Sequence, residues 1–238
     1  MKINPHHAAI LGEIQAKSGV ATSHTFLDSY LGNSHPRYAI NAPKLREIAR
    51  SWARNNKALS ATEFCKVVDS LIHGESSTEK VIGGMIMDYA TKEQIQFDPK
   101  IFDSWIEQLE GWAEVDAVCT GQYTINALPL QWSKWEKILK RFAKSKNIHK
   151  RRASLVLLCS PVRYCQEESM AAMAFANIEA LKHEREVLIT KAISWLLRSM
   201  IKNFKKEVSE YVSKNKDSLP SIAVRETLVT LKTGKKTK

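Results

Sequence analysis

The apolar residues of this 238-residue chain return every three or four positions almost from end to end. That spacing is typical of helices that bury one face. The stretches Val67–Ile72 and Val81–Ile86 are examples, whereas alternating strand patterns are almost absent. We therefore predict an all-α fold.

Four positions carry the signals of a helix start. Ser60 with Glu63 and Ser76 with Glu79 have capping-box spacing, in which each side chain bonds an amide of the other residue. Asp98-Pro99 and Asn41-Ala42-Pro43 each offer a capping residue close before a proline.

The expected helices follow one another at a regular distance. About twelve helices of roughly 10 to 18 residues fit the chain, joined by the short loops typical of antiparallel neighbours. Each pair takes roughly 35 to 45 residues, the period of HEAT-like repeats. We predict a HEAT-like solenoid of antiparallel helix pairs with a concave basic face, forming one domain over residues 1–238; a globular bundle is the alternative.

The charge balance favours a polyanionic partner. Thirty-six Lys and Arg face twenty-five Asp and Glu, which gives a formal net charge of +11. Nucleic acid is the leading candidate; a membrane partner is disfavoured because no apolar run reaches the roughly 18 residues that a spanning helix needs. Met1–Leu11 lacks the layout of a secretory signal, so we expect a cytoplasmic protein. The four cysteines form no CxxC pair, which favours reduced thiols and no bound metal.

The segment from Gln131 to Arg152 holds nine positive charges and one negative, Glu136. Such a run often marks only a solvated surface. With tryptophans on one helical face and lysines such as Lys140 and Lys144 on the others, it also suits phosphate binding. We favour the phosphate-binding interpretation.

Trp112 and Asp116 are four residues apart, so on a helix they point the same way from consecutive turns. A core tryptophan beside a solvent-exposed acid is the simpler interpretation of such a pair. However, Arg152 and Trp195 follow at intervals close to the helix-pair period, and equivalent positions of successive repeats line one surface.

Four segments resemble the AlkD-type bacterial alkylpurine DNA glycosylases, a DNA alkylation repair family of HEAT-like proteins, and the resemblance covers nearly the whole chain. They are Ala39–Ala49, Trp112-Ala113-Glu114-Val115-Asp116, Arg151-Arg152-Ala153 and Lys191-Ala192-Ile193-Ser194-Trp195-Leu196-Leu197-Arg198. Two positions depart from the family pattern: Ala113 replaces a frequent second tryptophan, and Ala39 replaces a glycine.

The resemblance implies removal of N3- or N7-alkylated purines from double-stranded DNA in base excision repair, without a deep base pocket. Trp112 and Trp195 would flank the deoxyribose with Asp116 between them, and Tyr30 would contact DNA. Arg152 would hold phosphate, although Arg151 could take that role. It also implies a bacterial, nucleoid-associated protein.

The residue types suit this chemistry. An alkylated purine is cationic and leaves readily, so a fixed carboxylate such as Asp116 would mainly stabilise positive charge on the sugar. No lysine suggests a nucleophile for strand cleavage, and no P-loop, GxGxxG or HExxH motif occurs. We expect a monofunctional hydrolase, monomeric and without cofactor. A DNA-binding protein that recognises shape without catalysis, or a protein-interaction scaffold, are the alternatives.

Overall fold

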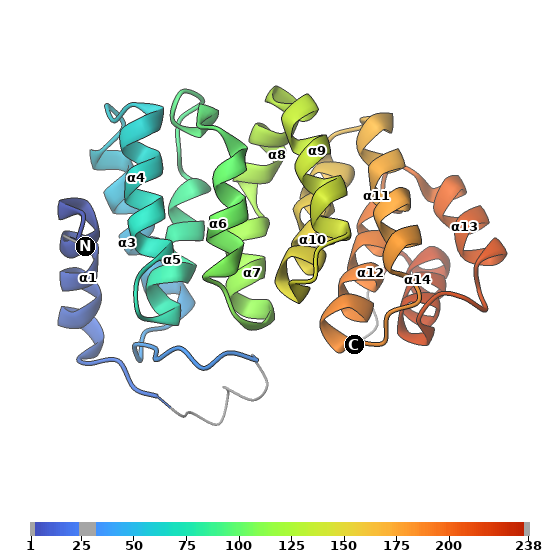
Figure 1. Cartoon of the computed structure of the whole chain (residues 1–238), viewed down its shortest axis with the longest axis horizontal. Coiled ribbons are helices and arrows are strands. Elements are labelled where there is room, and N and C mark those ends of the chain that lie inside the picture. Colours follow the sequence, from blue (N-terminus) through green and yellow to red (C-terminus); the bar gives the residue numbers. More distant parts are fainter. Residues whose placement is uncertain (1–2, 24–31, 236–238) are drawn as a thin grey trace. The chain divides into compact units, whose positions relative to one another are not determined.

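The structure is a computed structural model that describes residues 3–23 and 32–235. Over these ranges the chain forms 13 α-helices and two 3₁₀ turns, and its β structure is limited to one isolated bridge between Thr22 and Arg37 (Figure 1). The predicted all-α fold is confirmed.

Two compact units divide the chain, Met1–Ala127 and Leu128–Lys238, and each is described by itself. The single domain expected over residues 1–238 therefore stays a prediction. The first unit contains α1 (Pro5–Ser18), α3 (Ala42–Asn55), α4 (Ala61–Ile72), α5 (Ser77–Met87), the 3₁₀ turns Gln94–Gln96 and Pro99–Ile101, α6 (Phe102–Glu107) and α7 (Gly111–Cys119). The boundary falls inside α8 (Gln122–Leu130), and the second unit contains α9 (Trp132–Ala143), α10 (Ile148–Tyr164), α11 (Glu168–Leu181), α12 (Val187–Met200), α13 (Lys205–Lys214) and α14 (Ser221–Thr233).

Three of the four expected helix starts are confirmed as starts of α-helices. Both capping boxes form, at the starts of α4 and α5, and Asn41 accepts a hydrogen bond from the amide of Lys44 at the start of α3. Asp98 caps a single 3₁₀ turn instead, after which α6 begins at Phe102. Local capping chemistry therefore fixes these helix ends, as expected.

The helices of the first unit stack as antiparallel pairs. α5 packs between α3 and α7, and α4 packs on α5 and α1 (Figure 1). Gly84 allows α5 and α7 to approach closely, because a Cβ atom there would overlap the backbone carbonyl of Ala117. The glycine at this position therefore permits the close packing of these two helices.

The second unit repeats the arrangement. α10, α12 and α14 pack in succession, while α9 packs on α10 and α11 (Figure 1). Trp135 and Phe142 of α9 are fully buried, as are Leu155 of α10 and Leu196 of α12. Full burial of one such side chain contributes about 1.5 to 3 kcal/mol, so the apolar faces provide the main stabilisation of this unit.

Candidate nucleic-acid interface

Trp112 and Asp116 both lie on α7 and are both half-exposed. They occupy consecutive turns, about 6 Å apart along the helix axis, and so share one face. Val115 and Val118, between and beyond them, are buried and hold the helix to the core of the first unit. α7 therefore presents an indole and a carboxylate together.

Arg152 and Trp195 belong to the second unit, on the neighbouring helices α10 and α12. Arg152 is only 4% exposed, and its guanidinium donates to the backbone carbonyl of Leu188 in the first turn of α12. Leu188 and the half-exposed Trp195 are seven residues apart on α12, so they share a face. Arg152 thus fixes the start of the helix that carries Trp195.

Arg151, the other candidate for a phosphate contact, is also engaged within the protein. Its Nε lies 2.7 Å from a carboxylate oxygen of Glu184, and its Nη1 donates to the carbonyls of Ser145 and Lys146. The guanidiniums of Arg151 and Arg152 therefore both link α10 to neighbouring segments of the second unit.

Fewer side chains of the Gln131–Arg152 segment are exposed than its charge count suggests. Lys150 is 8% exposed and Arg152 4%, because α10 is covered by α9, α11 and α12. Lys140 and Lys144 are exposed, and Lys140 pairs with Glu136 at 2.7 Å. Lys140 lies in the last turn of α9 and Lys144 caps its end, and α9 packs on α10 and α11, whereas Trp195 lies on α12. The exposed lysines and Trp195 thus belong to different helix layers of this unit.

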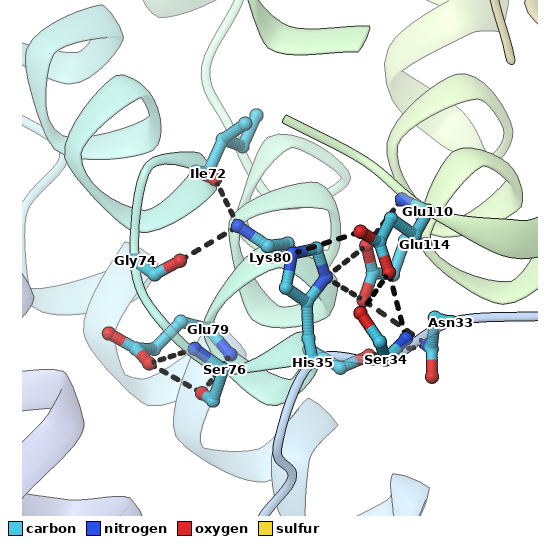
Figure 2. A network of polar contacts seen from close by, with 11 residues as sticks. Asn33, Ser34, His35, Ile72, Gly74, Ser76, Glu79, Lys80, Glu110 and Glu114 are labelled. Carbon is cyan, nitrogen blue, oxygen red and sulfur yellow. Dashed lines mark hydrogen bonds and ion pairs between the residues drawn. The ribbon is translucent and has the colours of Figure 1, made fainter. Parts of the chain in front are cut away.

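α7 also carries a fully buried carboxylate, to which the sequence assigned no role. The side chain of Glu114 is fully buried, and it accepts hydrogen bonds from Nδ2 of Asn33 at 3.2 Å and from the amide of Glu110 at 2.8 Å. Nδ1 of His35 lies 3.0 and 3.1 Å from its two oxygens (Figure 2). Glu114 stands inside the recognised Trp-x-Glu-x-Asp pattern, but nothing in the sequence marks Asn33 or His35 as its partners.

A second buried polar group lies at the start of α5. Glu79 accepts hydrogen bonds from Ser76 and lies 2.8 Å from Nε2 of His7. Burial opposes its ionisation, but these hydrogen bonds outweigh burial and place the pKa of this carboxyl below its usual value. Burial lowers the pKa of Lys80, whose ammonium donates to the carbonyls of Ile72 and Gly74 (Figure 2).

Two basic residues of α12 accompany Trp195. Lys191, one turn earlier, is exposed on the same face. Arg198 follows Trp195 and lies 3.3 Å from Glu226 of α14, which also accepts a hydrogen bond from Ser194. Lys191 and Arg198 lie in the recognised Lys-Ala-Ile-Ser-Trp-Leu-Leu-Arg segment, yet the sequence assigned a role there only to Trp195.

The remaining predictions concern Tyr30, metals and the membrane. Tyr30 lies outside the described residues. Within residues 3–23 and 32–235 no group of three His, Cys, Asp or Glu side chains could hold a metal ion, and no helix is long and apolar enough to cross a bilayer.

Comparisons with known proteins give one family and one similar fold. None of the curated proteins compared matches the sequence. A solved structure, described as a predicted DNA alkylation repair enzyme from Enterococcus faecalis, is similar with a TM-score of 0.68 and 19% identity, covering 95% of each chain. At this identity the likeness shows the fold. The family model described as DNA alkylation repair enzyme matches residues 15–231, and the chain therefore belongs to the DNA alkylation repair enzyme family.

Proposed function

We propose that this protein is a monofunctional DNA glycosylase that hydrolyses the N-glycosidic bond of N3- or N7-alkylated purines in double-stranded DNA, as the first step of base excision repair. The observation that carries the proposal is the shared face of Trp112 and Asp116 on α7. Membership of a DNA alkylation repair family supports it.

Asp116 would act on the sugar. As the bond between the base and the anomeric carbon breaks, its electron pair leaves with the alkylated base, which departs uncharged. The carboxylate stabilises the positive charge that develops on the deoxyribose and orients a water molecule. The water oxygen then bonds to the anomeric carbon, and its proton passes to solvent. The products are a free base and an abasic site.

The tryptophans would contact the DNA through their rings. The face of an indole attracts a cationic group by about 0.5 to 2 kcal/mol, depending on how fully the pair is desolvated. Both Trp112 and Trp195 are half-exposed and can therefore offer a ring to a ligand. We assign Trp112 to the deoxyribose beside Asp116, and we keep Trp195 as a proposed DNA contact of the second unit.

Positive charge would hold the DNA backbone. Lys191 is the exposed cation on the face of Trp195, and we assign it a direct phosphate contact. Arg152 would add its charge from a position fixed by the carbonyl of Leu188. We keep Tyr30 as a proposed DNA contact, and Arg151, Lys140 and Lys144 as proposed contacts whose positive charge also strengthens attraction over a longer range.

The test uses DNA carrying 7-methylguanine, with released bases identified by chromatography. We expect the wild-type protein to release the base and Asp116→Asn to be slower by roughly 10²- to 10³-fold, because a neutral amide cannot stabilise the sugar cation. DNA affinity should be nearly unchanged.

A matched control removes one negative charge elsewhere in the same unit. Glu13→Gln alters an exposed acid of α1 and should release base at the wild-type rate. Release by Asp116→Asn at that same rate would exclude the carboxylate from the reaction. No release by the wild type would contradict the glycosylase assignment and favour a non-catalytic DNA-binding protein.

A further inference from the structure

The first turn of α7 differs from the first turns of α4 and α5, which carry capping boxes. Its N-cap residue, Glu110, makes no capping hydrogen bond with its side chain, and Gly111 has a φ of +65°. The amide of Glu110 instead donates to Glu114, one turn into the helix. Because Glu114 closes the turn from within the helix, the position of this turn depends on what holds Glu114.

The segment Asn33–Tyr38 holds Glu114. The side chains of Asn33 and His35 both approach its carboxylate (Figure 2). A carboxylate only accepts hydrogen bonds, so Nδ1 of His35 must carry the proton that it donates. Ser34 adds hydrogen bonds from its amide and its hydroxyl to Glu110, both at 2.8 Å. The segment therefore binds the first turn of α7 at both of its ends, Glu110 and Glu114.

The same segment is fixed on its other side to α5. The amide of Ser77 donates to the carbonyl of Pro36 at 2.9 Å, and the amide of Tyr38 donates to the hydroxyl of Thr78 at 3.0 Å. Nδ2 of Asn33 reaches Ser77 as well as Glu114. The start of α7 is thus tied through residues 33–38 to the start of α5, which its own capping box fixes.

Trp112 and Asp116 stand on the opposite side of α7 from Glu114. Each is two residues from Glu114, which places it about 200° around the helix. A change in the hydrogen bonds to Glu114 therefore shifts the exposed face of α7. Trp112 should move most, because it lies in the first turn. Displacements of about 1 Å in a catalytic arrangement can lower rates by about 10²-fold.

We propose that His35 and Glu114 are positioning residues, which hold the first turn of α7 so that Trp112 and Asp116 meet the damaged nucleotide correctly. The proposal rests on the glycosylase function proposed above. Neither residue touches the substrate: Glu114 is fully buried and His35 acts through it.

The experiment combines two readouts on the full-length protein. The first is the single-turnover rate of base release beside the affinity for methylated DNA. The second is the fluorine NMR spectrum of protein labelled with 5-fluorotryptophan, in which Trp112→Phe identifies the Trp112 signal among the six tryptophans.

We expect His35→Ala and Glu114→Gln to lower the single-turnover rate about 10- to 100-fold, to change DNA affinity by less than about twofold, and to shift or split the Trp112 signal. His35→Asn should restore both readouts, because its amide can donate from nearly the place of Nδ1. Glu114→Gln alters a fully buried site and is expected to lower stability. His35→Ala, at 23% side-chain exposure, therefore provides the variant that keeps its fold.

Ser60→Ala is the matched control. It removes the exposed capping box of α4 and lowers stability without touching residues 33–38 or α7, so both readouts should stay as in the wild type. The proposal is overturned if the Trp112 signal is unchanged in both His35→Ala and Glu114→Gln, or if their rates fall no further than that of Ser60→Ala. A wild type that releases no base overturns the glycosylase function instead, and the Trp112 signal still decides whether this pair holds α7.

Discussion

The two units support their tryptophan-bearing helices in different ways. In the second unit, α12 is held by its repeat neighbours: Arg152 of α10 and Glu226 of α14 reach it from 36 and 32 residues away, about one helix pair. In the first unit, α7 is held by residues 33–35, up to 81 residues distant, through a fully buried carboxylate. Contacts within the repeat thus position Trp195, whereas the first turn of α7, which carries Trp112, depends also on a segment outside the helix pairs.

This difference has an energetic consequence. Removing one partner from a buried, hydrogen-bonded carboxylate leaves donors unsatisfied in a medium where they cannot reach water. A partly exposed pair loses less, because water replaces the missing partner. Substitutions that remove a hydrogen-bonded carboxylate should therefore destabilise the first unit more than the second.

The largest stability effect is expected from a matched pair of Glu→Gln changes. Glu79→Gln in the first unit should lower the free energy of unfolding by about 3 kcal/mol, because the amide nitrogen of Gln replaces one of the two buried oxygens that accept from Ser76 and pair with His7. Glu226→Gln, whose side chain is 18% exposed, should cost about 1 kcal/mol. Urea unfolding of both variants measures the difference, and equal losses would contradict the contrast between the units.

Acid should lower the free energy of unfolding through the buried carboxylate Glu79 of the first unit. The pKa of Glu79 is lower in the folded chain than its value of 4.5 in the unfolded chain, so the unfolded chain takes up this proton first as pH falls. The stabilisation is complete above pH 4.5 and is lost as pH falls through the folded pKa. Glu79→Gln should flatten this part of the curve of unfolding free energy against pH, as measured by urea unfolding at several pH values.

A smaller effect separates the two layers of the second unit. Lys191→Ala should weaken binding to all duplex DNA and reduce the slope of log affinity against log salt by about 0.9, the loss of one phosphate contact. Lys140→Ala should change the slope less, since Lys140 pairs with Glu136 on α9. Titrations at about 50 and 200 mM salt compare them. A larger reduction of the slope by Lys140→Ala than by Lys191→Ala would contradict this assignment and indicate that DNA binds the layer that contains α9.

The sequence could predict the helices because their causes are local. Apolar spacing and the caps at Asn41, Ser60 and Ser76 act within a few residues, and the structure confirms them. The same spacing placed Trp112 and Asp116 on one helical face. These features need no knowledge of distant contacts.

Burial of charged groups could not be predicted in the same way. Lys150 and Arg152 follow a run of exposed lysines, and only the packing of α10 against three helices shows that they are covered. Glu114 gave a signal by its motif, but its partners Asn33 and His35 come from a segment whose path depends on α5 and α7 together. Such long-range polar contacts leave no periodic trace in a single sequence.

The central claim is that Trp112 and Asp116, on one face of α7, act on the same nucleotide. A double-mutant cycle on the single-turnover rate of 7-methylguanine release tests it most directly, using Trp112→Ala, Asp116→Asn and the double variant. The cycle of Asp116→Asn with Trp132→Ala, on half-exposed Trp132 of α9, serves as the control and should be additive. We predict a coupling of about 1 kcal/mol or more between Trp112 and Asp116. Additivity within about 0.5 kcal/mol would contradict the claim, because side chains that contact one sugar from the same helix face cannot act independently.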